Sequence, residues 1–162
     1  MTAFTIRTGT PDDAPIITAQ RRGMFIDMGH ADPAALDRMC AEFEPWVREK
    51  LAQGEYRAWL AVAGDGAVVA GAGLWLIPWP SNVIFLGKCR PYALNVYTDP
   101  NCRRSGLARR LMQAMLDWCR QEGYQVISLH ASEQGRPLYE DLGFLPTNEM
   151  RLPLDPSTTR RP

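Results

Sequence analysis

The sequence predicts a mixed α/β fold, with a central, mostly antiparallel and twisted sheet that carries helices on both faces. Two apolar runs flank Gly64-Asp65-Gly66 within residues 56–77, and this pattern is typical of two antiparallel strands joined by a tight turn. From residue 92 onwards, runs with strand and helix periodicity alternate. A hairpin followed by β-α-β-α-β indicates a mixed sheet with helices packed on either side.

The other elements follow from local signals along the chain. Asp32 and Pro33 suit the N-cap and first position of a helix, and Pro45 is expected to break or kink it because proline has no N–H and clashes with the preceding turn. Between Gly106 and Glu122, apolar residues recur at helical spacing. We expect strands at residues 4–7, 92–98, 125–131 and 150–154 and a proline-bounded connection at 78–91. We also expect a helix over 135–143 and one that runs to about Phe25, with Thr10, Asp12 or Asp13 as its cap.

Composition indicates one globular domain and excludes several classes of protein. The chain has 162 residues, of which 46% are hydrophobic and 22% charged, and we expect a single domain over residues 1–153 with a tail at 154–162. A formal net charge of zero argues against a nucleic-acid-binding protein. No apolar run approaches the roughly 18 residues of a membrane span, so we expect no membrane association.

Cysteine and histidine usage gives no sign of a metal site or of disulfides. The four cysteines are scattered without a CxxC pair, and only two histidines accompany them. This pattern is typical of reduced thiols, so we expect a cytoplasmic protein that holds no metal.

Four arginines surround a glycine in the stretch TDPNCRRSGLARRLM, which runs from Thr98 to Met112. A strand, a short turn and a helix starting near Gly106 would present unpaired N–H groups and the positive end of the helix dipole to an anion. The arginine side chains could then bind a diphosphate. A solvated arginine-rich surface helix explains the charge equally well, and the sequence lacks the GxxxxGK[ST] loop of nucleotide triphosphatases.

Two motifs in this half of the chain resemble those of the GNAT superfamily of N-acetyltransferases. Arg103-x-x-Gly106-x-Ala108, between a strand and an amphipathic helix, looks like the loop that binds the acetyl-CoA pyrophosphate in that family. Tyr139 in PLYEDLGF resembles the family's tyrosine on a short helix that ends in Leu-Gly-Phe. The resemblance covers the whole chain in element order and implies a GNAT-like fold, with a splayed strand pair that holds acetyl-CoA.

The resemblance also assigns cofactor contacts. Main-chain groups of Val96 and Thr98 would pair with the pantetheine arm, and the pyrophosphate would lie on the N–H groups from Arg104 to Arg109. Ser132 stands where the family often has an asparagine that bonds the pantetheine arm, which leaves that contact in doubt. The cofactor-binding residues implied are Val96, Thr98, Arg103, Arg104, Ser105, Gly106, Leu107, Ala108, Arg109 and Ser132.

The implied reaction is direct attack of a primary amine on the thioester. Tyr139 would protonate the departing thiolate, since the pKa values of a phenol and a thiol, about 10 and 8.5, are close. The Val96 N–H would hold the oxyanion. A base or a bound water must deprotonate the amine; some relatives use a glutamate where this chain has Asn95, and His130 is an open alternative.

In this family the acceptor site is formed mostly by residues 21–32 and 78–91. Met24, Phe25, Met28, Trp75 and Trp79 could form an apolar wall, Asp27 or Asp32 could hold an ammonium group, and Asn95 could orient substrate or water. A small amine or amino acid derivative is favoured over a protein lysine.

Two other functions stay open: a catalytically idle acyl-CoA-binding module, and a nucleic-acid binder that uses the arginines on a phosphate backbone. Neither the base nor the oligomeric state, a homodimer included, follows from the sequence.

Overall fold

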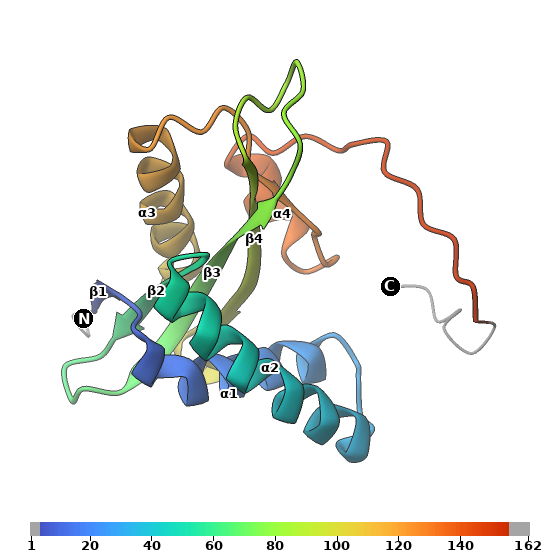
Figure 1. Ribbon diagram of the computed structural model, residues 1–162. Coiled ribbons are helices and arrows are strands. Elements are labelled where there is room, and N and C mark those ends of the chain that lie inside the picture. The colour runs from blue at the N-terminus through green and yellow to red at the C-terminus, as the bar shows by residue number, and fades with distance from the viewer. Residues whose placement is uncertain (1–3, 156–162) are drawn as a thin grey trace. The chain divides into compact units, whose positions relative to one another are not determined.

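The structure, a computed structural model, describes residues 4–155 in two compact units, residues 4–130 and residues 131–155. The first unit contains a five-stranded sheet and three α-helices, and the second contains one short helix (Figure 1). Each unit is described by itself below.

The sheet is mixed, as the sequence predicts. Its strands lie in the order β1 (Thr5–Thr8), β2 (Tyr56–Val62), β3 (Val68–Pro78), β4 (Cys89–Thr98) and β5 (Ser128–Leu129). The pairs β1–β2, β2–β3 and β3–β4 are antiparallel, whereas β4 and β5 are parallel. The β2–β3 hairpin is confirmed, with Gly66 at φ 88° in its turn, a conformation that favours glycine.

Helices cover both faces of this sheet, which confirms the predicted fold class. On one face, side chains of α1 (Ala14–Asp27) and α2 (Pro33–Gln53) form a core with Tyr56, Ala58 and Leu60 of β2. On the other face lies α3 (Leu107–Gln121), whose Trp118 ring meets the Trp59 ring edge-on at 6.0 Å between centroids. Alternate residues of β2 therefore point to opposite helices.

The face of the sheet covered by α3, here called the α3 face, is largely apolar. Residues at the predicted helical spacing are buried there, and they pack against small and branched side chains of β3. The buried residues of α3 are Leu107, Leu111, Met112, Met115, Leu116 and Cys119.

Of the two predicted outcomes at Pro45, a break or a kink in the helix, the break does not occur. The helix α2 continues from Pro33 through Pro45 to Gln53. Pro45 removes one backbone hydrogen bond, but Phe43 and Val47 on either side are both buried against the sheet, and this packing holds the two halves in one helix. Asp32 is the N-cap as predicted, and its carboxylate accepts from the Ala34 N–H at 3.0 Å.

Strand content after α3 is lower than the sequence predicts. The strand expected over 125–131 is reduced to Ser128–Leu129, and no strand forms at residues 150–154 within the described chain. Both segments have apolar, strand-like patterns. In residues 150–154, however, Met150, Leu152 and Leu154 are each at least 79% exposed, so this segment lacks the buried face that stabilises a strand. The short helix is confirmed as α4 (Arg136–Asp141). Residues 156–162 of the expected tail lie outside the described residues.

A β-bulge interrupts β4 at Asn95. Gly73 pairs with Leu94 and Gly71 pairs with Tyr97, so Asn95 and Val96 together face the single residue Ala72. Asn95 has φ 55°, which is uncommon for a residue other than glycine. The extra residue turns the Asn95 side chain to the α1 face, where simple alternation would have pointed it at α3.

Candidate active site

The outer edge of β4 is open along most of its length. In the register, β5 pairs only with Tyr92 and Ala93, although β4 continues to Thr98. The Asp99 N–H donates to the Val69 carbonyl at 2.8 Å, so by alternation the main-chain groups of Thr98 point away from β3 toward the open edge. Val96 lies in the bulge, where it faces Ala72 together with Asn95. The two residues that the sequence predicts as pantetheine contacts therefore lie on an unpaired strand edge.

The turn after β4 presents a row of unused N–H donors. A short 3-10 turn (Pro100–Cys102) leads to Arg104 at φ 60° and to Gly106, the N-cap of α3, at φ 76°. Within residues 4–155, the N–H groups from Arg104 to Ala108 find no acceptor, and the Arg110 N–H is the first to be used, on the Gly106 carbonyl at 3.1 Å. Space is open where a side chain on Gly106 would lie. Unpaired N–H groups at a helix N-terminus are of the kind that bind anions.

Arg103 and Asp27, predicted as a cofactor contact and a substrate contact, bind each other. The Arg103 Nη2 donates to Asp27 Oδ2 at 2.5 Å, and its Nε donates to the Thr98 carbonyl at 3.1 Å. The side chain is thus tied to the end of α1 and to β4 and has lost part of its positive potential to a carboxylate. Arg104 and Ser105 are exposed, and the Ser105 hydroxyl donates to the Cys102 carbonyl.

Asn95 belongs to a polar cluster between the sheet and α1. Its Oδ1 accepts from Arg21 Nη1 at 2.6 Å, and its Nδ2 donates to the Tyr56 hydroxyl at 2.9 Å. Burial raises the pKa of Tyr56 to about 12. A Cβ at Gly73 would collide with the Tyr56 hydroxyl, so the glycine of β3 makes room for this cluster.

Sequence analysis did not single out Arg21 or Tyr56 as site residues. One signal was available: Arg21 lies four positions after Ile17 and four before Phe25, so it occupies the inward stripe of an amphipathic helix. An arginine side chain in that stripe requires a polar partner. Asn95 is that partner, but only because the bulge turns its side chain toward α1, and the hydrophobic periodicity of β4 does not reveal the bulge.

The predicted apolar wall is only partly assembled. Phe25 packs against Arg21 and meets the His30 ring at 5.3 Å between centroids, while Met28 is 45% exposed. Trp79 lies in the β3–β4 connection, where Arg90 stacks over its ring at 5.2 Å. In the part of the chain that is described, no ring contact joins Trp79 to Phe25.

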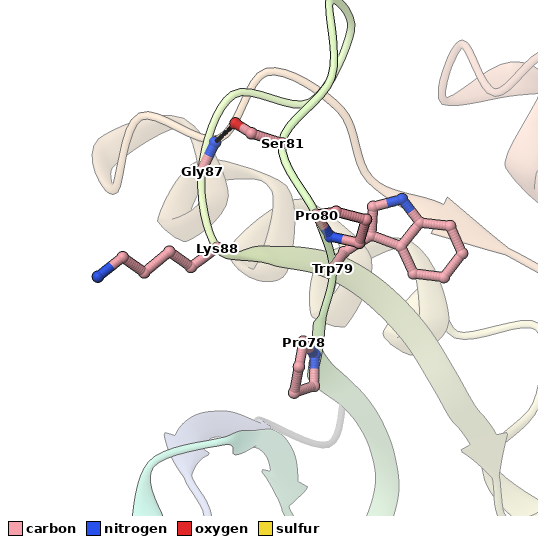
Figure 2. Close-up of a pocket in the computed structure, with 6 residues that line it drawn as sticks. All are labelled: Pro78, Trp79, Pro80, Ser81, Gly87 and Lys88. Carbon is pink, nitrogen blue, oxygen red and sulfur yellow. Dashed lines mark hydrogen bonds between the residues drawn. The ribbon is translucent and has the colours of Figure 1, made fainter.

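A shallow hollow on the β3–β4 connection is lined by Trp79 and its neighbours. Figure 2 shows its six lining residues, all from that connection or the ends of its strands: Pro78, Trp79, Pro80, Ser81, Gly87 and Lys88. None of them belongs to the donor-rich turn or to the Asn95 cluster. We therefore assign the candidate site from hydrogen-bonding geometry and not from this hollow.

Tyr139 and Ser132, the predicted contacts in the second unit, are both well ordered by local bonds. Tyr139 on α4 is buried, its ring meets Phe144 at 5.9 Å between centroids, and burial raises the pKa of its hydroxyl. Ser132 Oγ accepts from the Gly135 N–H at 3.1 Å, so this hydroxyl stabilises the turn before α4. The phenol stays protonated at neutral pH and can donate a proton.

Comparison with known proteins gives the family. The model of the acetyltransferase (GNAT) family matches residues 26–144, which is more than half of the chain. This chain belongs to the acetyltransferase (GNAT) family. The predicted resemblance is thereby confirmed, and the protein is an acetyltransferase. No curated protein sequence matches the chain.

Solved structures of GNAT acetyltransferases have the same fold. A GCN5-related N-acetyltransferase from Ralstonia eutropha is 35% identical with a TM-score of 0.87, and the match covers 94% of this chain and 99% of that one. A predicted acetyltransferase from Clostridium acetobutylicum, solved with acetyl-CoA, is 25% identical with a TM-score of 0.84, covering 94% and 96% of the two chains. An aminoglycoside N-acetyltransferase in complex with CoA shares the fold at 18% identity, with a TM-score of 0.69 and coverage of 96% and 97%.

Among residues 4–155 no group of three or more histidine, cysteine, aspartate or glutamate side chains is placed to hold a metal ion. No helix in the described chain is both long and apolar enough to cross a membrane.

Proposed function

We propose that this GNAT acetyltransferase transfers the acetyl group of acetyl-CoA to the primary amine of a small molecule, such as an amino acid derivative. The observation that carries the proposal is the row of N–H donors from Arg104 to Ala108 beside the open edge of β4. A similar protein from Clostridium acetobutylicum was solved with acetyl-CoA, which is consistent with this cofactor.

The described residues fit acetyl-CoA. The N–H groups from Arg104 to Arg109 would hold the pyrophosphate, and the exposed Arg104 and Arg109 side chains would add charge. Main-chain groups of Val96 and Thr98 would extend the β4 ladder to the pantetheine amides. The bound cofactor supplies an activated acetyl group as a thioester. Ser132, already bonded to Gly135, would contribute through its remaining hydrogen-bonding capacity.

Two groups of the chain would act on the reacting atoms. The N–H of Val96, which lies in the bulge of β4, would stabilise negative charge on the thioester oxygen as the amine attacks. The Tyr139 hydroxyl would donate its proton to the departing sulfur. Its raised pKa keeps that proton in place at neutral pH, so the phenol is in the required form before each turnover.

The amine must lose a proton before it attacks. Asn95 has no basic group, and both ends of its amide are bonded to Arg21 and Tyr56. We therefore assign deprotonation to a water molecule rather than to a side chain of β4. We also propose that residues 1–153 work as one domain in the cytoplasm, with a small-molecule acceptor and neither nucleic acid nor metal.

Calorimetric titration with acetyl-CoA tests the proposal on three proteins. The natural protein should bind in the micromolar range, and Gly106→Asp should lose at least 100-fold in affinity because its carboxylate would fill and repel the anion site. Gly64→Asp adds the same charge in a hairpin turn where space is also open, so its affinity should stay unchanged. Equal binding by all three proteins, or none by the natural one, would refute the proposed cofactor site.

A second assay separates an enzyme from an idle binding module. Thiol release with a panel of small amines should occur in the natural protein, and Tyr139→Phe should lower kcat about 10- to 100-fold while the affinity for acetyl-CoA changes little. Tight acetyl-CoA binding without thiol release from any amine would favour the idle module.

A further inference from the structure

Arg21 is a cation placed on the inward face of α1 without a carboxylate partner. Within residues 4–155 other arginines form ion pairs with aspartate or glutamate, among them Arg22 with Asp37 and Arg103 with Asp27, both at 2.7 Å or less. Arg21 forms none within residues 4–155. Its protein contacts are one hydrogen bond to Asn95 and two aromatic rings.

The two rings hold the guanidinium on a fixed site. Its central carbon lies 5.0 Å from the centroid of Phe25 and 4.6 Å from that of Phe43, both within cation–π range. The hydrogen bond to Asn95 Oδ1, at 2.6 Å, fixes its orientation within that site. An arginine held in this way keeps its remaining N–H donors in one direction, at little further entropic cost on binding.

The Arg21 side chain also has an unsatisfied donor. Its Nε is buried without an acceptor within the described residues. Asn95 accepts from Arg21 and donates to the Tyr56 hydroxyl, and neither of these two side chains brings a negative charge. Burial also lowers the pKa of Arg21, which reflects the lost hydration of a charged group.

Such a site is unfavourable for folding alone. A desolvated charge normally has an ion-pair partner, and unpaired buried donors each cost free energy. An oxyanion that arrives with the substrate would accept from Arg21 and restore the missing interactions. The arrangement is therefore that of a binding site and not of a structural ion pair.

From this arrangement we propose that Arg21 binds an anionic oxygen group, a carboxylate or a phosphate, on the same small molecule whose amine is acetylated. The proposal rests on the proposed function and specifies its acceptor. The position suits this role because Asn95, bonded directly to Arg21, precedes Val96, whose N–H faces the reacting carbonyl in the proposed mechanism. Arg21 is thus a residue that selects and positions the acceptor.

Paired amines test the proposal through acetyl-CoA-dependent thiol release. L-Phenylalanine and L-methionine would each be compared with the corresponding carboxamide, and O-phosphoethanolamine with ethanolamine. In the natural protein the anionic member of at least one pair should have the larger kcat/KM, by about 10- to 100-fold, as expected for charged hydrogen bonds. The amino acid pairs and the phosphate pair distinguish the two sources of the anion.

Two neighbouring arginines give a matched set of variants. Arg21→Gln should remove the preference for the anionic member by lowering its kcat/KM about 10- to 100-fold, with less than a threefold change for the neutral member. Arg22→Gln should leave both values unchanged, because Arg22 pairs with the exposed Asp37. Unfolding of each variant would be followed by circular dichroism, and Arg21→Lys, which keeps the charge, provides a second variant if Arg21→Gln does not fold.

The proposal and the function on which it rests can fail separately. If the natural protein acetylates neutral and anionic amines equally well, or if Arg21→Gln lowers both members of a pair equally, the role of Arg21 is wrong and the acetyltransferase function stands. If no amine releases thiol, calorimetry with the same anionic amines in the presence of CoA decides: binding that Arg21→Gln abolishes supports the anion site, and its absence in the natural protein overturns it.

Discussion

The two faces of the sheet differ in how their side chains are satisfied. On the α3 face, Leu111, Met112 and Met115 are fully buried, and the contact with β3 is made by apolar atoms. On the α1 face, the apolar core formed with α2 adjoins the cluster of Arg21, Tyr56 and Asn95, in which the buried Arg21 Nε has no acceptor within the described residues. Apolar contacts satisfy the first face, whereas the second contains a charged side chain, Arg21, that forms no ion pair within residues 4–155.

This difference separates residues that hold the fold from residues that serve the reaction. Removing an apolar side chain from a complete core costs stability, while removing a strained or unsatisfied polar group costs function and little stability. The predictions below test whether the two faces follow these rules.

The largest change in stability is expected on the α3 face. Leu111 is 0% exposed, and Leu111→Ala should lower the free energy of unfolding by about 3 kcal/mol because it leaves a cavity in a close-packed core. Urea denaturation measures the change. Leu86→Ala, at a position that is 70% exposed, is the control and should change stability by less than about 0.5 kcal/mol. A loss below 1 kcal/mol at Leu111 would mean that the α3 face is not a tight core.

The α1 face should respond to alkaline pH through Tyr56. Its pKa is raised to about 12 in the folded protein, while in the unfolded chain it ionises near pH 10. The neutral Tyr56 hydroxyl therefore makes its full contribution to the free energy of unfolding below pH 10. This contribution is lost as the pH rises through about 12, and the complete loss amounts to roughly 2 to 3 kcal/mol. Burial also raises the pKa of Tyr124 and Tyr139, so the quantity to measure is the difference between the natural protein and Tyr56→Phe in urea denaturation. Parallel stability curves for the two proteins from pH 9 to pH 12 would refute this assignment.

The smallest effect is expected at the ion pair that joins α1 to the anion-binding turn. Asp27→Asn should strengthen acetyl-CoA binding by about two- to fivefold at low salt, because Arg103 then keeps its full charge beside the phosphates. The gain should disappear at high salt, and calorimetry at two ionic strengths measures both values. Weaker binding by Asp27→Asn would show instead that the carboxylate positions Arg103.

The sequence predicts the α3 face far better than the α1 face. Helical spacing in residues 107–121 and the Arg103-x-x-Gly106-x-Ala108 motif are local signals, and both appear in the structure where they were expected. The cluster at Arg21 depends instead on a bulge that brings Asn95 to the opposite face from the one that alternation predicts. A bulge is a relation between two strands, so the pattern of one strand does not show it.

The pairing of Asp27 with Arg103 was missed for a related reason. The sequence predicts Asp27 as a substrate contact and Arg103 as a cofactor contact, each from its own segment. Only the folded chain brings the end of α1 to the turn after β4. The strand predicted at residues 150–154 is wrong for another reason: the apolar pattern is present, but the apolar side chains of this segment are exposed. Apolar alternation predicts a strand only where a surface exists to bury it.

One variant tests the contrast between the faces most directly: Arg21→Met, measured both for unfolding by urea and for kcat/KM with an amino acid and its carboxamide. Methionine keeps the apolar contacts with Phe25 and Phe43 and removes the unpaired charge. We predict that stability falls by less than about 1 kcal/mol while the preference for the amino acid disappears. A loss of several kcal/mol with the preference intact would contradict the assignment and make Arg21 part of the core.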